Sequence, residues 1–518
     1  MNDDDSTFQR ARRQLFRQFP VAAVAFSTDG REVHWAGPVD IGLDIGGLAI
    51  AENPDDTAVV LQVRDVRIVE REAAELSVKI DDPDVARFAG TALVKPVIRA
   101  AAGTAAVLGK LDAGAFSPDG GRGVDAFGEL PIRAATADEL AICATGFNHG
   151  AATIGVGSFR QSAAVPARLR SKGFGRHTFM CGQSGSGKTY TTGVLFERLL
   201  ADTGLPLIVI DPNSDHVHLA SLADPDDTSP EGIRYRDLAS SVRVAGARGT
   251  GADFTLCADF SEFNADVQAL LLRLDPIRDM DQYAALRALT ATLRAPYSIG
   301  DVATAAAAAG PEFTGIALRI ANLGLDSWDI WRRDGEDSLL SAHPEGLPRC
   351  LVLDVGSLSR PDERAAASLV LLGNRWVRRR ERTPMLIAVD EAHNVFPTST
   401  TNPLLQATAE LGALIAGEGR KFGLHLFIAT QRPSKVHPNV VSQCDNLILM
   451  RMNGAGDVQD LATLFSHVPE PLLRQSTSFG LGQALFAGPI APVPLIAQIG
   501  TRLTKEGGGD VSTSWASS

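Results

Sequence analysis

One short segment limits the fold of this 518-residue chain more than any other. Residues 182–189 read GQSGSGKT, so four residues separate two glycines, and lysine and threonine follow the second. This spacing matches the phosphate-binding P-loop, in which backbone N–H groups hold a triphosphate and glycine permits the necessary chain conformations. A Gly/Ser-rich loop can match by accident, but HTFMCG before it is typical of a strand and KTYTTGVLFERLL after it of an amphipathic helix. The segment therefore predicts a nucleotide-binding loop.

The chemistry of such a loop assigns roles to its residues. The N-terminus of the following helix adds partial positive charge. Lys188 is expected to reach the β- and γ-phosphates of ATP, and Thr189 to bind Mg²⁺. The predicted nucleotide-binding residues are Gly182, Gln183, Ser184, Gly185, Ser186, Gly187, Lys188, Thr189 and Tyr190.

Two carboxylates follow an apolar run much later in the chain. Met385–Val389 predicts a buried strand that ends in Asp390 and Glu391. Asp390 suits the Mg²⁺ shell, and Glu391 is placed to polarise the attacking water as a general base. A strand that merely ends in two solvated acids is common, but the P-loop favours a catalytic pair. The letters DEAH also match a class of helicases whose other motifs are not visible here.

A further strand, Leu424–Ala429, ends in Thr430 and Gln431. A polar side chain at this strand tip can sense the γ-phosphate, so Gln431 is a candidate catalytic residue. Arg420 and Lys421 precede the strand. They are either a basic turn on a solvated surface or a source of positive charge for a phosphate.

Two kinds of sequence pattern divide the chain into domains. Residues 21–166 contain short β-like runs separated by Gly, Asp and Pro, and we expect a small β-barrel. The alternation of apolar residues that starts at Val59 changes phase at Val66, which predicts a bulge near Asp65. The expected strands include residues 21–27, 47–51, 57–70, 76–80 and 91–98.

The remainder predicts an α/β domain. In residues 167–500 apolar strands alternate with helical segments, as in a parallel sheet, and residues 224–348 form a helical insertion rich in Ala and Leu. Residues 1–20 and 501–518 are expected to be an N-terminal tail and a flexible C-terminal tail.

Composition limits the partners and the compartment. The net charge of −12 excludes a protein that coats nucleic acid over its whole surface, so any contact needs a local basic patch or a lined channel. Five scattered cysteines without a CxxC pair argue against a disulfide framework or a zinc site. No apolar run reaches the ~18 residues of a membrane span, and acids occupy the start of the chain. We expect a cytoplasmic protein without a membrane partner.

The segments DEAHNVFP at 390–397 and EGRKFGLHLFIATQRPSKVHPNVVSQCDN at 418–446 resemble the HerA family, within the HerA–FtsK group of hexameric DNA-pumping ATPases. The β-rich N-terminal part, LIVIDPNSDH and GQALFAGPIAPVPLIAQI are similar to the barrel, the second core strand and the closing strands with the C-terminal arm of that family. FtsK itself normally carries membrane spans. The sequence DPNSD replaces a stretch that often contains glycine, which leaves the roles of Asp211 and Asp215 open.

The resemblance implies a RecA-like core and a homo-hexamer that hydrolyses ATP with Mg²⁺ and translocates double-stranded DNA. It implies that Arg420 acts on the nucleotide of the adjacent subunit. It also implies work with a partner nuclease in DNA repair, or with an effector such as a sirtuin-like NAD hydrolase in anti-phage defence. The alternative is an ATP-dependent scaffold that assembles and activates an effector. Candidate DNA contacts are Lys435 and Arg375–Arg382, the latter otherwise a solvated helix face; residues 168–177 either link the domains or lie near a neighbouring nucleotide.

Overall fold

The structure is a computed structural model that describes residues 22–72, 97–119, 121–338, 340, 342–343 and 346–507. The described residues form two compact units, one within residues 1–150, 159–166 and 469–475 and a second within residues 151–158, 167–468 and 476–518. The predicted tail at 1–20, the predicted strand at 76–80, most of that at 91–98, and residues 508–518 lie outside the described residues.

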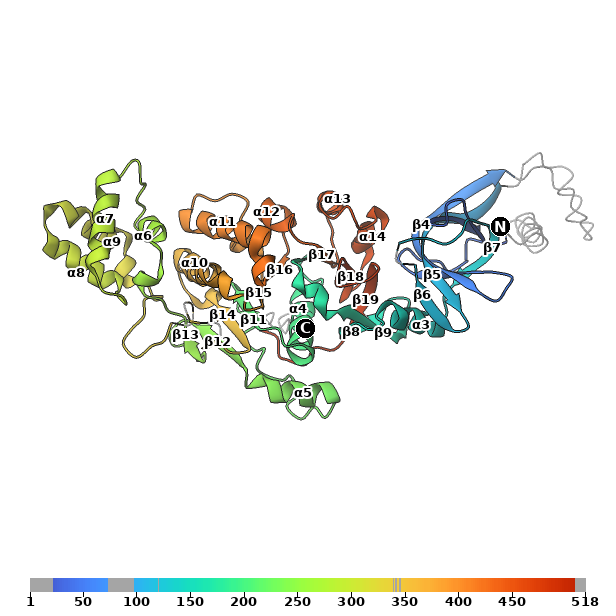
Figure 1. The fold of residues 1–518 in the computed structure, drawn as a ribbon, viewed down its shortest axis with the longest axis horizontal. Coiled ribbons are helices and arrows are strands. Elements are labelled where there is room, and N and C mark those ends of the chain that lie inside the picture. The colour runs from blue at the N-terminus through green and yellow to red at the C-terminus, as the bar shows by residue number, and fades with distance from the viewer. Residues whose placement is uncertain are drawn as a thin grey trace, which may run out of the picture. The chain divides into compact units, whose positions relative to one another are not determined.

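The first unit contains the predicted β-barrel (Figure 1). Its strands are β1 (Val24–Ser27), β2 (Glu32–Gly37), β3 (Leu48–Glu52), β4 (Ala58–Glu72), β5 (Val97–Asp112), β6 (Ala115–Pro118) and β7 (Phe127–Ala134). They follow the order β2-β1-β7-β3-β4-β5-β6, and β2 also pairs with β5, which closes six of them into a ring. All these pairings are antiparallel. A helix, α3 (Ala137–Phe147), follows the barrel strands and begins at a capping box formed by Thr136 and Glu139.

The predicted bulge is present in β4. The register between β4 and β5 shifts between Val63 and Asp65, and again between Val60 and Leu61. Leu61 and Val63 point into the barrel core, whereas Ile68, beyond the bulge, is 62% exposed. Gly103 lies opposite the bulge, where a Cβ atom would lie 1.8 Å from the carbonyl oxygen of Asp65. The bulge therefore requires glycine on the neighbouring strand.

The second unit is built on a largely parallel sheet, as the sequence predicts. Its strands are β8 (Thr153–Phe159), β9 (Ser162–Arg170), β10 (Thr178–Cys181), β11 (Leu207–Asp211), β12 (Val242–Gly246), β13 (Phe254–Thr255), β14 (Cys350–Asp354), β15 (Met385–Val389), β16 (Leu424–Thr430), β17 (Asn446–Leu449), β18 (Gln483–Ala487) and β19 (Leu495–Ile499). The order is β13-β12-β14-β11-β15-β16-β10-β17-β18-β19-β8-β9. In this order, each neighbouring pair of strands from β13 through β17 is parallel. The next two pairs, β17 with β18 and β18 with β19, are antiparallel. Residues at the carboxyl ends of β10, β11, β15 and β16 therefore share one edge of the sheet.

Helices precede and follow these strands (Figure 1). They are α4 (Lys188–Asp202), α5 (Pro230–Ala239), α6 (Ala265–Leu271), α7 (Met280–Thr292), α8 (Ile299–Ala309), α9 (Thr314–Leu323), α10 (Pro361–Val377), α11 (Pro403–Glu418), α12 (Pro438–Val441), α13 (Ala455–Leu464) and α14 (Glu470–Arg474). The segment 224–348, predicted as helical, contains α5 to α9 but also β12 and β13. Its short run Val242–Gly246 is buried and extends the sheet edge next to β14, because its valines fit a buried parallel strand. In the described part of the chain, no helix has the length and apolarity needed to cross a bilayer.

Candidate nucleotide site

The P-loop connects β10 to α4 at the carboxyl edge of the sheet. Gly185 and Gly187 have φ of +72° and +88°, in the left-handed region that glycine adopts without strain. At Gly182 a Cβ atom would lie 2.7 Å from the Cβ of Met450, so a larger residue would collide with the chain after β17. The glycines that the sequence singles out are therefore required by the geometry of the loop.

The loop offers polar groups that suit a triphosphate. The Ser186 hydroxyl oxygen is buried and, among the residues that the structure describes, has no hydrogen-bond partner. The guanidinium of Arg451 donates a hydrogen bond to the carbonyl oxygen of Gly185 (2.8 Å), and the Gly482 N–H donates one to that of Ser186 (3.2 Å). Thr189, half-buried, lies on the first turn of α4. The site thus combines a loop fixed by hydrogen bonds, an unpartnered hydroxyl and a helix N-terminus. These features fit the predicted phosphates and the predicted Mg²⁺.

Lys188 is buried against the two predicted carboxylates. Its Nζ lies 2.6 Å from Oδ1 of Asp390 and 3.0 Å from Oε1 of Glu391, and all three side chains are less than 5% exposed. Burial opposes the charge on Lys188, but the two carboxylates outweigh burial and raise its pKa. Burial likewise disfavours ionised Asp390, yet Lys188 and His216 hold its pKa well below the ordinary range. The three groups therefore form a compact, buried cluster, in which Lys188 and Asp390 each favour the charged form of the other.

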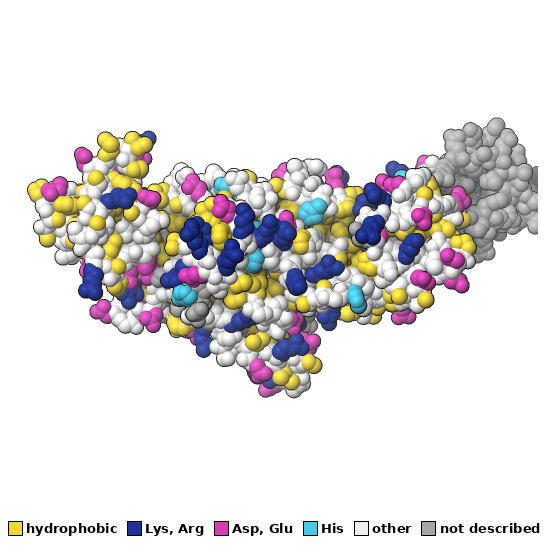
Figure 2. Space-filling view, viewed as in Figure 1, with side chains coloured by type: hydrophobic (Ala, Val, Ile, Leu, Met, Phe, Trp, Pro, Cys, Tyr) yellow, Lys and Arg dark blue, Asp and Glu magenta, His cyan; other side chains and the backbone are white. Residues whose placement is uncertain are grey.

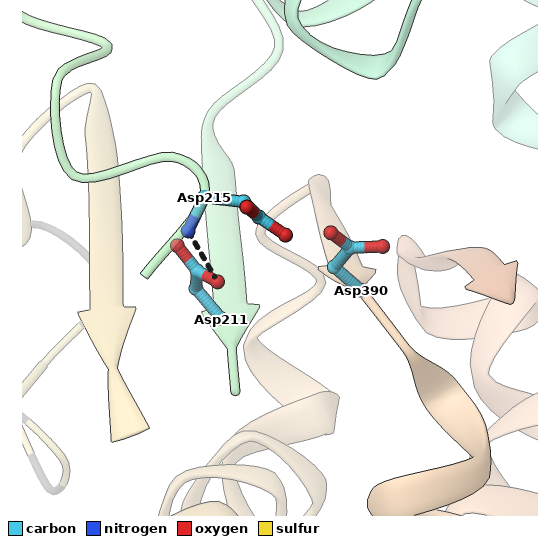
Figure 3. A group of neighbouring side chains, drawn as sticks. All are labelled: Asp211, Asp215 and Asp390. Atoms are coloured by element: carbon cyan, nitrogen blue, oxygen red, sulfur yellow. Dashed lines mark hydrogen bonds between the residues drawn. The ribbon is translucent and has the colours of Figure 1, made fainter. Parts of the chain in front are cut away.

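Asp211 and Asp215 lie beside Asp390. One carboxylate oxygen of each lies within 4.8 Å of the other two, and Figure 3 shows Asp215 pointing toward Asp390. Asp211 accepts hydrogen bonds from the N–H groups of Asn213 (3.2 Å), Asp215 (3.1 Å) and His216 (2.7 Å). Its carboxylate therefore shapes the loop after β11. Burial and the neighbouring carboxylates raise the pKa of Asp215 to about 6.

His216 joins the site and was not predicted. Its Nε2 lies 3.3 Å from Oδ2 of Asp390, opposite the oxygen that Lys188 contacts. The side chain is fully buried, and its ring lies 5.4 Å from that of Phe196 on α4. Its Nδ1 has no hydrogen-bond partner in the described part of the chain. The His216 N–H is hydrogen-bonded to Asp211 at the end of β11, and its ring contacts Asp390 after β15. These two contacts let His216 fix the orientation of Asp390. No periodicity or motif in the sequence marks it.

Glu391 is held in an unusual conformation. It has φ of 40° and ψ of 51°, the left-handed region that a residue with a side chain rarely adopts. Its Oε1 accepts a hydrogen bond from Nε2 of Gln431 (2.7 Å), and Nδ1 of His393 lies 3.3 Å from its Oε2. His393 also lies 3.1 Å from the hydroxyl of Thr430. The structure thus brings Gln431 directly onto Glu391, and His393 is a contact that the sequence did not reveal.

Arg420 lies at the other edge of the sheet. It belongs to a 3-10 turn, Gly419–Phe422, that precedes β16, whereas Gln431 follows that strand. Seven residues of β16 separate the two ends by ~20 Å, at ~3.3 Å per residue. The Arg420 side chain is 49% exposed, and its Nη1 lies 3.6 Å from Oδ2 of Asp445. The structure therefore does not bring Arg420 into the nucleotide site of its own chain.

The predicted basic segments are partly exposed. Lys435 is exposed and lies just after β16, on the edge of the sheet that carries the P-loop. Arg375 is 1% exposed, so it cannot contact DNA as predicted. The segment Arg378–Arg382 continues past the end of α10 and is half-buried to exposed, with Arg379 4.2 Å above the ring of Trp376. Only this second half of the predicted run remains a candidate contact.

The end of the described chain lies against the P-loop helix. The Arg502 N–H donates to the hydroxyl oxygen of Tyr190 (2.7 Å), and Arg502 Nη1 donates to the carbonyl oxygen of Thr189 (3.4 Å). Glu197, fully buried on α4, accepts a hydrogen bond from the Leu503 N–H (2.9 Å). The Gly507 N–H donates to the carbonyl oxygen of Asp215 (3.1 Å). Residues 502–507, part of the predicted flexible tail, thus connect α4 to the loop of Asp215.

Comparison with known proteins adds the family. Residues 154–307 match the family model described as "Helicase HerA, central domain". A relative named "DNA double-strand break repair helicase HerA" from Sulfurisphaera tokodaii is 25% identical over 78% of this chain and 79% of its own length. The chain therefore contains a HerA central domain, and its relatives are named HerA helicases. The HerA central domain, as matched, contains the P-loop and β11 but ends before Asp390, Glu391 and Gln431.

Other HerA relatives match over shorter stretches. The "Probable DNA double-strand break repair helicase HerA" of Methanocaldococcus jannaschii is 33% identical, but the alignment covers a quarter of this chain and a quarter of that protein. Among solved structures, VirB4 of Thermoanaerobacter pseudethanolicus has a TM-score of 0.46 and 15% identity, over 68% of this chain and 97% of its own.

Proposed function

We propose that this chain is an ATPase that works as a hexameric ring and translocates double-stranded DNA. One observation carries the ATPase activity in this proposal: Lys188, which follows the P-loop glycines, is buried against Asp390 and Glu391 at the carboxyl end of β15. A P-loop lysine, a carboxylate for the metal and a second carboxylate for water are the parts that phosphoryl transfer to water needs.

Each residue has a defined task in this proposal. Lys188 exchanges its contact with the carboxylates for the β- and γ-phosphates. Thr189 and Asp390 hold Mg²⁺, which neutralises charge on the phosphates when bound. Glu391 accepts the proton of the attacking water, and Gln431, 2.7 Å from Glu391, keeps the carboxylate aimed and senses the γ-phosphate. His216 holds the free oxygen of Asp390 in place.

The position of Arg420 is an argument for assembly into a ring. An arginine that meets the γ-phosphate is worth about 10³ to 10⁵ in rate, and in this chain Arg420 lies a full strand length from its own P-loop. The only nucleotide that it can reach therefore belongs to another copy. Its planar, permanently charged fork suits phosphate oxygens.

DNA is the proposed cargo because the relatives named above are described as DNA double-strand break repair helicases. The net charge of −12 confines DNA contacts to local patches, and Figure 2 shows Lys and Arg side chains grouped near the middle of the face in view. Exposed Lys435, at the nucleotide edge of the sheet, and the segment Arg378–Arg382 are the proposed contacts.

The deciding experiment measures ATP hydrolysis with and without linear duplex DNA at increasing salt, together with displacement of a third strand from a DNA triplex. If the chain translocates DNA, duplex DNA should stimulate ATP hydrolysis, and this stimulation should fall steeply with salt. The protein should also displace the third strand of the triplex, and Glu391→Gln should abolish this displacement. The alternative, an ATP-dependent scaffold for a partner nuclease or effector, predicts ATPase activity indifferent to DNA and no displacement. Either of these two results would contradict translocation.

A further inference from the structure

Three neighbouring strands each follow a charged residue at the edge of the sheet opposite the nucleotide. The strands β16, β10 and β17 are adjacent and parallel, and Thr178 pairs with both Phe427 and Asn446. This register brings together Arg420 before β16, Arg176 before β10 and Asp445 before β17.

Asp445 contacts both arginines. Its Oδ2 accepts a hydrogen bond from Nη1 of Arg176 at 2.9 Å and lies 3.6 Å from Nη1 of Arg420. All three side chains are about half exposed, and ion pairs of this exposure add little to folding stability. Stability therefore does not explain why a carboxylate is placed between two arginines.

The backbone that carries Asp445 is fixed. The next residue, Asn446, is fully buried, and its Nδ2 donates to the carbonyl oxygen of Gly173 and to the hydroxyl of Thr178, both at 3.0 Å. Its Oδ1 accepts a hydrogen bond from the Ile490 N–H (3.0 Å). Asp445 therefore presents its carboxylate from a point that packing and hydrogen bonds determine.

The side chain of Arg420 needs a fixed neighbour of this kind to define its orientation. Its side chain is long and half exposed, so on its own it samples many rotamers. A group that acts across an interface must be delivered in a defined orientation, because misplacement by about 1 Å can cost ~100-fold in rate. We propose that Asp445 is a positioning residue that holds Arg420, beside Arg176, in the orientation that meets the nucleotide of the neighbouring copy. This inference rests on the proposed role of Arg420 in trans.

The test uses mixed rings made by co-expressing two differently tagged subunits. Acceptor subunits carry Arg420→Ala and keep Glu391, whereas donor subunits carry Glu391→Gln and keep Arg420. Only interfaces that join a donor arginine to an acceptor site can hydrolyse ATP. Asp445→Asn on the donor is expected to lower the recovered kcat about 10-fold with little change in KM, because the arginine is loosened and the acceptor site is intact.

The same substitution on the acceptor is expected to leave the recovered activity unchanged. The matched control is Glu470→Gln on the donor, which removes one ion-pair partner of Arg474 from another exposed ion pair at 2.6 Å. Equal losses from donor and acceptor would indicate a structural role and overturn the proposal, as would unchanged or higher activity with the donor variant. Mixed rings that recover no activity with Asp445 intact would instead refute the trans action of Arg420.

Discussion

The ammonium nitrogen of Lys188 lies 2.6 Å from a carboxylate oxygen of Asp390, and both side chains are at most 3% exposed. Each group thereby neutralises a charge that would be costly to bury alone. The same lysine is the group expected to contact the phosphates. Nucleotide binding must therefore exchange one buried ion pair for another, and substitutions here affect stability and activity together.

Lys188→Ala is expected to reduce ATP hydrolysis by orders of magnitude and to weaken nucleotide binding. It also leaves Asp390 and Glu391 buried without their cation, which should cost about 3–5 kcal/mol of unfolding free energy. Calorimetric titration with ATP and denaturant unfolding measure the two effects. Lys435→Ala, at an exposed lysine, is the control for loss of charge, and unaltered stability in Lys188→Ala would contradict the buried cluster.

Glu391→Gln is expected to keep nucleotide binding and assembly but to stop turnover. The amide preserves the size of the side chain and its contact with Gln431, but it cannot accept a proton from water. Gln431→Ala should lower kcat less, because the base remains. Single-turnover hydrolysis separates the two variants, and normal turnover by Glu391→Gln would rule out its role as base.

Asp215→Asn should make stability less dependent on pH. Burial, Asp390 and Asp211 raise the pKa of Asp215 from 3.8 to about 6 in the folded protein, so the folded state holds this proton more tightly than the unfolded state. Ionised Asp215 therefore destabilises the fold above pH 6, and the penalty disappears as the pH falls toward 4. In nucleotide-free protein with a chelator, the variant should raise Tm at pH 8 but not at pH 4. A gain in Tm equal at both pH values would exclude this cause.

Gly193→Ala tests the contact between α4 and the C-terminal segment. Alanine favours a helix over glycine by about 1 kcal/mol, but a Cβ atom here would lie 2.5 Å from Cζ of Arg502. Arg502 is 5% exposed and hydrogen-bonded to Thr189 and Thr504, so it cannot move aside easily. Overpacking, at about 1–3 kcal/mol, should therefore give a net loss of stability. Gly373→Ala on α10, with open space around it, should instead stabilise the protein, and a gain at both glycines would contradict the contact.

The sequence predicted the parts of the fold that local patterns encode. Alternating apolar residues gave the barrel and the bulge at Asp65, and buried runs gave β15 and β16 with their polar ends. The P-loop spacing identified Lys188, and the structure places it against Asp390 and Glu391. The roles of these residues in hydrolysis stay predictions, which the substitutions described above test.

Contacts between distant segments were not predictable in this way. His216 contacts Asp390 across 174 residues, and Glu197 meets Leu503 across 306. Neither pair leaves a periodic or compositional signal in one sequence. The strand β12 was missed because a five-residue run within an Ala- and Leu-rich region does not reveal that it pairs with β14.

The parallel strands β16, β10 and β17 give each protomer a direction. Their carboxyl ends carry the nucleotide site, and their amino ends carry Arg420 and Asp445. A symmetric dimer that joined two like edges would pair site with site or arginine with arginine, and neither site would be completed. Under the proposed action of Arg420 in trans, only head-to-tail contacts supply an arginine to a site, and such contacts produce either rings or open filaments. In this proposal, any open assembly leaves one nucleotide site without an arginine, whereas in a closed ring every copy both receives an arginine and supplies one.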